Sequence, residues 1–141
     1  MSRGHRALRH LAGIDVEAWA ETREECLAEA VQALVETFAE VGAAVPDDCV
    51  VVVSAEETDE ALLVAVLDEV IYQVEECHRV AVDVSVDERT KATEGQVEVR
   101  LATVPVAVVD RVGAVPQAVA VRELSFGRID GVWRAHVGVG G

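Results

Sequence analysis

The sequence predicts an α+β fold in which two helices pack on a mixed, largely antiparallel β-sheet. Two segments carry apolar residues at the three- and four-residue spacing of an amphipathic helix. Several other segments alternate apolar and polar residues, which is the period of a half-buried strand. Valine is frequent and aromatic residues make up only 4% of the chain, so the core must be aliphatic and rich in sheet.

Length and composition set the domain organisation. With 141 residues, of which 51% are hydrophobic, we expect a single domain over residues 1–141 and a flexible N-terminus over residues 1–9. The net charge of −14 disfavours direct binding to nucleic acid, because phosphate backbones repel an acidic surface. No apolar run is long enough to span a membrane, and no secretory signal follows the basic N-terminus, so we expect a cytoplasmic protein with no membrane partner.

The first strand and helix are the clearest elements. Residues 14–20 alternate between apolar and polar side chains, which predicts a strand with one buried face. Thr22 and Glu25 have the spacing of a capping box, so a helix should begin after Thr22. The apolar stripe of this helix continues to Val41, and Gly42 is a typical helix stop.

The patterns of the second strand and the second helix indicate deeper burial than those of the first pair. The apolar run Cys49–Ala55 is typical of a central strand that is covered on both faces. Thr58 is a good N-cap for a helix over Asp59–Cys77. This helix has few polar positions, so we expect it to be the more buried of the two.

Two hairpins complete the predicted fold. Apolar and polar side chains alternate in both Arg79–Asp87 and Gln96–Thr103, which predicts two strands. The polar stretch Glu88–Gly95 between them is predicted to be the loop of the hairpin. The terminal hairpin joins Ala118–Phe126 to Val132–Val139.

The Asp130-Gly131 pair is the turn signal of that terminal hairpin. The apolar segment Val104–Pro116, which contains two prolines, predicts an irregular cover or a short helix.

Known catalytic patterns are missing from the sequence. It contains no GxGxxG, GxxxxGK[ST], GxSxG or HExxH motif. Cys26, Cys49 and Cys77 form neither a CxxC pair nor a zinc spacing, which suits buried thiols in a reducing cytosol.

Asp15 and Glu17 are the one pair of carboxylates that suggests a site. Two residues apart on a strand, they point to the same side. They could share a hard cation such as calcium or magnesium. The alternative is a solvated strand face with no ligand.

The chain resembles the archease family in three places. The family begins with a strand of the form H-T-A-D-I-x-[IV], has a second helix with the core L-x-E-[LV]-[IL]-[YF], and ends in a hairpin. The matching residues are His10, Ala12, Ile14 and Val16 in the strand, Leu67–Tyr72 in the helix, and Gly131, Trp133 and Arg134 in the hairpin.

The resemblance implies a function and a partner. Archease proteins are small cytosolic α+β domains that assist the GTP-dependent RNA-splicing ligase. They promote its guanylylation and turnover in tRNA splicing or RNA repair without being enzymes themselves. The partner surface would then be the end of the sheet that carries His10, Asp15 and Glu17.

The resemblance also implies a divalent cation of the calcium type. The family binds it with the Asp of the first strand and an acidic residue near the C-terminus. Those two positions fall on Gly13 and Gly140 here, so Asp15, two residues along the same face, is the candidate metal ligand.

Two other functions remain open. The apolar Val104–Pro116 segment would suit a binding module that keeps the fold but serves a different protein partner without a metal-dependent role. A metal-dependent hydrolase using Asp15, Glu17 and a histidine is the other alternative.

Overall fold

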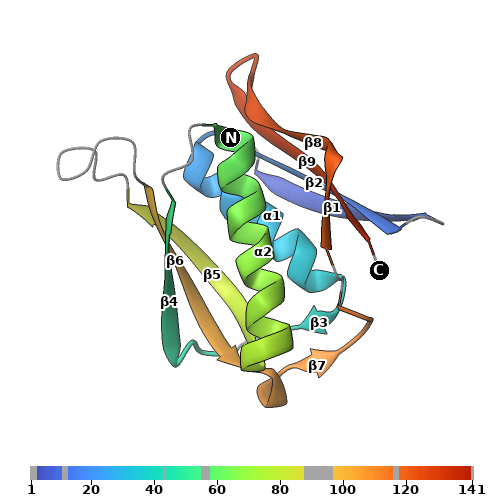
Figure 1. Ribbon diagram of the computed structural model, residues 1–141, viewed down its shortest axis with the longest axis vertical. Coiled ribbons are helices and arrows are strands. Elements are labelled where there is room, and N and C mark those ends of the chain that lie inside the picture. The colour runs from blue at the N-terminus through green and yellow to red at the C-terminus, as the bar shows by residue number, and fades with distance from the viewer. Residues whose placement is uncertain are drawn as a thin grey trace.

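The computed structural model describes residues 3–10, 13–42, 44–54, 58–87, 97–115 and 118–140. Two larger sheets enclose two helices, and a small two-stranded ladder lies at one end (Figure 1). The first sheet has the strand order β1-β2-β9-β8, the second has β4-β6-β5, and the ladder is β3-β7. The elements are β1 Gly4–His10, β2 Gly13–Ala20, α1 Arg23–Glu36, β3 Ala39–Glu40, β4 Asp48–Ser54, α2 Asp59–Cys77, β5 Arg79–Asp87, β6 Val97–Pro105, η1 Val106–Val108, β7 Asp110–Arg111, β8 Ala118–Ile129 and β9 Val132–Gly140.

The predicted fold class is confirmed, with one refinement. All the strand pairings among the described residues are antiparallel, and they form separate sheets instead of one mixed sheet. Both helices and both larger sheets contribute to one cluster of buried residues. Neither helix, within the described ranges, combines the length and apolar character needed to cross a bilayer.

Helix α1 begins as predicted and ends early. The Thr22 side chain accepts a hydrogen bond from the Glu25 N–H at 3.1 Å, which satisfies one of the unpaired donors of the first turn. The helix stops at Glu36 instead of reaching Val41, because the last turn tightens into i→i−3 bonds. Thr37 Oγ1 adds to this by donating to the Leu34 carbonyl at 2.7 Å.

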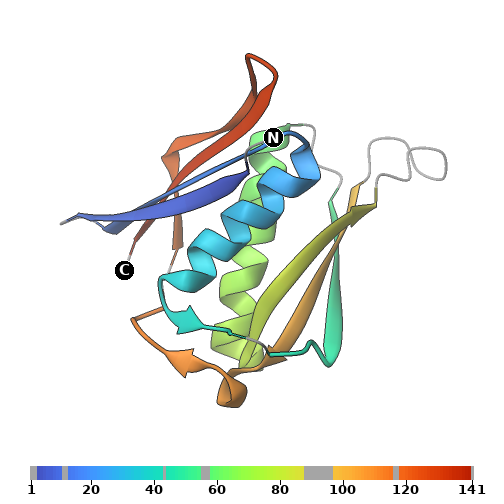
Figure 2. The same cartoon turned by 180° about the vertical axis from the view of Figure 1, so that it is seen from behind.

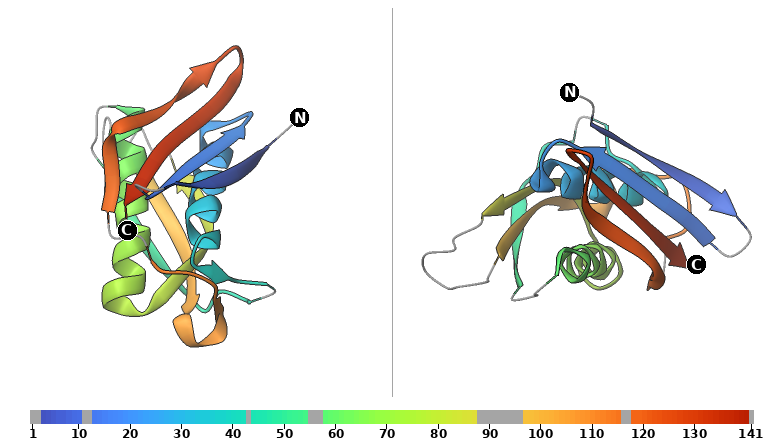
Figure 3. Two further views of the ribbon diagram at one scale, coloured as in Figure 1. Left: turned by 90° about the vertical axis from the view of Figure 1, so that its right-hand side faces the viewer. Right: turned by 90° about the horizontal axis from the view of Figure 1, so that it is seen from above.

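Helix α1, not α2, is the more buried helix, so that prediction is wrong. Nine of the 14 residues of α1 are buried, against eight of the 19 residues of α2. Figure 3 shows the reason: α1 lies between the two larger sheets, whereas α2 lies toward the open side. A helix in a middle layer needs small residues on more than one side, and alanines at positions 28, 30 and 33 supply them.

The remaining elements follow the pattern with local differences. Val104–Pro116 includes the end of β6, the short helix η1 and strand β7, which pairs with β3. The terminal hairpin turns at Asp130 and Gly131 as predicted, with positive φ angles of 51° and 80°. The loop predicted over Glu88–Gly95 lies outside the described residues.

Most of the N-terminal segment expected to be flexible forms strand β1. It pairs with β2 along its whole length, from Gly4 opposite Trp19 to His10 opposite Gly13 (Figure 2). The sequence shows no apolar alternation here, because polar residues of β1 face both the solvent and helix α1. Ion pairs to α1 replace the apolar contacts that usually mark a strand.

Candidate functional site

The first sheet has one covered face and one open face. In β2, Val16, Ala18 and Ala20 are buried toward the helices, and the alternate residues, which include Asp15 and Glu17, point outward. We call this open side the outer face. The sheet therefore brings Asp15 and Glu17 together on it as the sequence predicts. His10 ends β1 opposite Gly13, but its side chain lies outside the described part of the chain.

Charged residues cross the outer face in a row. Arg6 lies opposite Glu17, and Glu17 lies opposite His136 in the strand register. The Arg6 Nε donates to the Glu17 carboxylate. His136 Nε2 lies 4.0 Å from Asp15 Oδ2. Gly138 lies opposite Asp15, so no side chain there separates the imidazole from that carboxylate.

A shallow hollow of about 490 Å³ opens on the outer face. Its lining combines basic, aromatic and aliphatic side chains with one carboxylate. The side chains that matter most are Arg6, Glu17, Trp19, Ile129, Arg134 and His136. Two guanidinium groups in one hollow make this face far less acidic than a chain of net charge −14 would suggest. Such a surface suits a partner that presents both apolar and negatively charged groups.

The position at which the resemblance implies a metal-binding Asp, Gly13, does not accept a side chain in this backbone. Gly13 has a φ of +147°, and a Cβ placed there would lie 2.3 Å from the Val139 carbonyl oxygen. A carboxylate at Gly13 would therefore require both strand β9 and the local backbone to move. This is a structural reason for glycine here, beyond the loss of a ligand.

The described residues also fail to supply the rest of a cation site. A calcium-type ion takes about six to eight oxygen ligands. Gly140 has no side chain, and no group of three or more His, Cys, Asp or Glu residues gathers within the described ranges. Asp15 has the imidazole of His136 as its neighbour, and an imidazole nitrogen is a poor ligand for calcium. The donor set does not fit this ion.

A second polar cluster lies on the covered side of β1, where sequence analysis expected a flexible tail. Arg3 Nε donates to Glu29 at 2.7 Å, and its Nη1 lies 3.3 Å from Glu25. His5 lies between two carboxylates, with Nδ1 at 2.7 Å from Glu29 and Nε2 at 2.9 Å from Glu36. We call these five residues the β1–α1 cluster. The only signal in the sequence is the basic N-terminus itself.

The β1–α1 cluster sets the charges of its members. Burial alone would lower the pKa of His5, but hydrogen bonds to Glu29 and Glu36 outweigh it, and the net pKa is raised. Burial would likewise raise the pKa of Glu29, but hydrogen bonds from His5 and Arg3 reverse the effect and lower it. The cluster therefore favours an imidazolium at His5 beside an ionised Glu29.

The three cysteines differ in exposure, so the prediction of buried thiols is correct for Cys26 and wrong for the other two. Cys26 is fully buried in α1, and burial raises the pKa of its thiol to about 12. Almost none of it is thiolate at neutral pH, and the thiolate is the reactive form. Cys49 and Cys77 are exposed and lie on different elements.

Comparison with known proteins decides the family. The sequence pattern of the Archease protein family matches residues 5–139, which is nearly the whole chain. The chain belongs to the archease family. It is 38% identical over 136 residues to proteins called "Probable protein archease" in two strains of Mycobacterium tuberculosis, CDC 1551 / Oshkosh and H37Rv. The match covers 96% of this chain and 74% of each relative.

Solved structures confirm the archease fold. Protein 1598 of Methanobacterium thermoautotrophicum, determined in solution, superposes with a TM-score of 0.73 at 17% identity, covering 97% of this chain and 98% of that one. The crystal structure of a Thermotoga maritima archease, described as a possible chaperone, gives a TM-score of 0.63 at 19% identity, covering 95% and 94%.

Proposed function

We propose that this archease-family chain is a non-catalytic accessory protein of the GTP-dependent RNA-splicing ligase. In this role it promotes guanylylation and turnover of the ligase during tRNA splicing or RNA repair, in the cytoplasm. Family membership over residues 5–139 is the observation that carries the proposal. The net charge of −14 supports a protein partner over direct contact with RNA.

The outer face is the surface that we propose for the ligase. It carries two of the three residues predicted for a partner surface, Asp15 and Glu17, and it is not covered by either helix. Its mixed charges and exposed apolar groups, Leu8 and Ile129, are typical of a surface that binds another protein. The ligase would supply the catalytic groups, and this chain would supply shape and charge.

A divalent cation is not needed for this proposal. The family's two metal positions are glycines, and Gly13 cannot take a side chain without backbone movement. Asp15 is the remaining candidate ligand, with His136 beside it. We therefore derive the ligase-assisting role from the protein surface and assign no step to a metal.

The decisive experiment is multiple-turnover RNA ligation by the cognate ligase, with GTP and a divalent metal, in the presence and absence of this protein. We expect more product per ligase and faster formation of the ligase–guanylate adduct when the protein is added. Folding of the added protein is checked by circular dichroism. A folded protein that leaves both rates unchanged would contradict the proposal.

A different protein partner is the second candidate function. The observation that favours it is the exposure of Val108 and Val112, at 58% and 53%, in the segment that follows β6. Val104, near the end of β6, and Val109, after η1, are buried, so only part of this apolar region is available to a partner. Limited proteolysis of the folded protein tests this interpretation, because cleavage near Val112 requires an accessible backbone.

A further inference from the structure

Strand β4 is an open edge of the second sheet. The order β4-β6-β5 places it at one end, and β6 is its one strand partner among the described elements. In Figures 1 and 2 it lies along the margin of the molecule, with no helix or strand beyond it. Its register against β6 runs from Asp48 to Ser54 without a shift. A regular edge of this kind presents a row of backbone groups that can pair with another chain.

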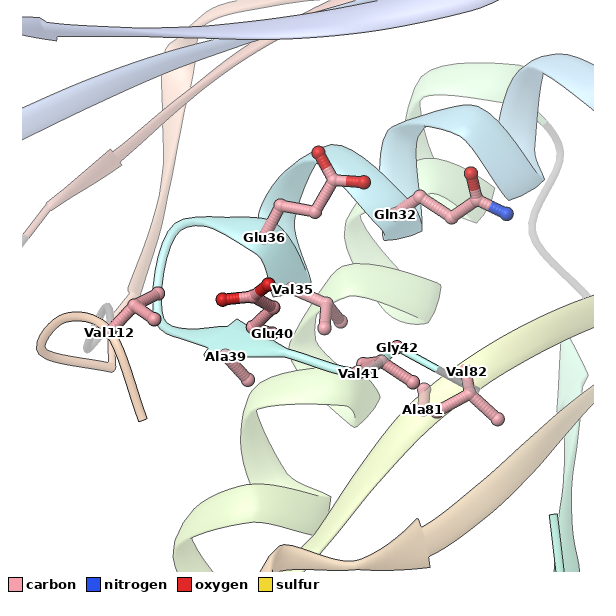
Figure 4. Close-up of a pocket in the computed structure, with 10 residues that line it drawn as sticks. All are labelled: Gln32, Val35, Glu36, Ala39, Glu40, Val41, Gly42, Ala81, Val82 and Val112. Carbon is pink, nitrogen blue, oxygen red and sulfur yellow. The ribbon is translucent and has the colours of Figure 1, made fainter. Parts of the chain in front are cut away.

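The opposite edge of the same sheet, strand β5, is protected. Its register against β6 shifts between Ala81 and Asp83. Figure 4 shows Val41, from the segment after β3, beside the same part of β5, where a hollow of about 570 Å³ opens. Further along β5, the Val86 N–H donates to Glu24 Oε2 at 2.7 Å. An irregular register and a side chain that occupies a backbone donor both prevent another strand from pairing there.

The edges of the first sheet have protection of other kinds. Strand β1, at one end, has two arginines and two histidines among its seven residues. Strand β8, at the other end, has a register shift against β9 between Ala120 and Ser125. Residues 49–53 of β4 contain no charged residue and no proline, and their register is unbroken. Of the four edges that the two larger sheets present in the described residues, β4 is therefore the one most open to pairing.

The odd-numbered residues of β4 direct their backbone groups to the free edge. The Cys49 N–H donates to Asp48 Oδ1 at 2.8 Å, which places it on the side of the strand away from β6. Backbone groups alternate between the two sides along an antiparallel strand. Val51 and Val53 therefore also direct their N–H and C=O groups away from β6.

The other edge of the sheet gives the same alternation. The Val86 N–H points away from β6, because it donates to Glu24. Val86 and Val52 both lie opposite Val99 of the central strand β6. A residue of a central strand directs its N–H and C=O to one neighbour, so Val99 pairs with Val52 and not with Val86. Val51, the next residue, then faces the free edge.

We propose that β4 pairs with β4 of a second copy of this chain, antiparallel about a twofold axis through Val51. Residues with outward backbone groups then oppose each other: Val51 meets Val51, and Cys49 meets Val53 in both directions. Each of these pairs joins two apolar residues, which favours cross-strand pairing. Asp48 lies opposite Ser54, so no like charges meet across the strands.

This contact uses the same surface of both copies and leaves neither β4 edge open. Two three-stranded sheets become one sheet of six strands, and the two chains form a closed pair. The self-complementary register is what defines a second copy as the occupant. The interface is separate from the outer face proposed for the ligase, because that face belongs to the first sheet.

Sedimentation equilibrium of the full chain tests the pairing, in about 0.15 M salt to screen the net charge of −14 on each copy. We expect the average mass to approach that of two chains as the concentration rises to about 100 μM, because a single strand pairing is a small, weak interface. Val51→Lys should raise the dissociation constant at least about tenfold, since like charges would meet on the axis. Val108→Lys, at an exposed valine on η1, is the matched control and should dimerise like the wild type. Circular dichroism checks that both variants are folded.

Cross-linking of the native thiols tests the register. Cys49 is exposed, and the two copies of Cys49 would lie on one face of the joined sheet, about 14 Å apart, because each is two residues from the axis. A bismaleimide of that span should link two chains. Cys77→Ser should leave the yield unchanged, whereas Cys49→Ser should abolish it. Cys26 is buried and should not react.

Three outcomes would overturn the proposal. A mass of one chain at every concentration would exclude self-association. Equal dimerisation of Val51→Lys and the wild type would exclude this edge, and a cross-link that needs Cys77 instead of Cys49 would exclude this register. Each outcome is independent of the ligase assay, because the two experiments concern different sheets.

Discussion

The two sides of the β1–β2 ribbon use the same kinds of residues for different purposes. On the covered side, Arg3 and His5 reach α1 and meet Glu29, which is 7% exposed, in short hydrogen bonds. On the outer face, Arg6 pairs with Glu17, whose side chain is 30% exposed. The covered cluster fixes an edge strand to a helix, whereas the outer pairs remain accessible to a partner.

The difference shows that the side of the strand on which a charged residue lies, not its residue type, decides its role. Charges on the covered side hold the strand to the helix, and charges on the outer side can contact a partner. His5 and Arg6 are neighbours in sequence, yet one faces a helix and the other faces solvent. Removing one partner of a partly buried ion pair leaves the other charge without compensation and lowers stability, whereas a solvated pair contributes little. Substitutions on the two sides should therefore have very different effects, and four experiments test this.

The largest effect on stability is expected at Gly13, an outer-face position where the neighbouring backbone leaves no room for a side chain. Gly13→Ala should lower the free energy of unfolding by about 3 kcal/mol, because it combines an unfavourable φ with a contact to the Val139 carbonyl. Urea denaturation followed by circular dichroism measures the change. Gly127→Ala is the matched control, since a Cβ there meets nothing within 4 Å. Equal stability of the two variants would contradict the tight contact.

The covered cluster should give the next largest effect. Glu29→Gln keeps the size of the side chain and removes the charge that Arg3 and His5 share, so we expect a loss of about 2 kcal/mol. Glu17→Gln makes the same change on the outer face and should cost about 0.5 kcal/mol or less. Denaturation curves of both variants give the comparison directly. A larger loss for Glu17→Gln would reverse our assignment of the two faces.

Local patterns in the sequence predict the fold well where the structure depends on residues close together in the sequence. Thr22, Thr58 and the Asp130-Gly131 turn act within a few residues, and all three occur as predicted. Strand β1 and the β3–β7 ladder depend on residues far away in the chain. Their sequences carry no periodic signal, because the partner supplies the hydrogen bonds and, for β1, the opposite charges.

The third effect is a pH dependence from His5. A doubly protonated imidazole donates to both Glu29 and Glu36, whereas the neutral ring can donate to only one. Because the pKa of His5 is raised in the folded protein, its stabilisation is complete below its ordinary pKa of 6.5 and is lost as the pH rises through the raised value. We expect about 1 kcal/mol less stability on the alkaline side.

Two measurements check the sign of this pH dependence. Denaturation at a series of pH values should show the alkaline loss in the wild type and not in His5→Asn. At the acid end the lowered pKa of Glu29 acts in the opposite direction, so its contribution is lost as the pH falls below 4.5 and through the lowered value. An alkaline loss that persists in His5→Asn would assign it to another group.

The candidate site contains features that the sequence predicts and others that it does not. Asp15 and Glu17 are placed on one face by strand alternation alone, so that prediction is confirmed. The neighbours of those residues come from other strands: Arg6 from β1 and His136 from β9. Only the sheet order brings them together, and strand order cannot be deduced from local spacing. The covered cluster was missed for the same reason.

The smallest effect on stability is expected on the outer face itself, at Asp15. Asp15→Asn removes one charge opposite Gly138 and near His136, at a distance of 4.0 Å, so the free energy of unfolding should change by about 0.5 kcal/mol or less. Stimulation of the ligase should nevertheless fall if this face binds it. Asp48→Asn, on the exposed end of β4 in the second sheet, has the same charge change and should stimulate like the wild type. Equal stimulation by both variants would remove Asp15 from the partner surface, because folding would be intact in each.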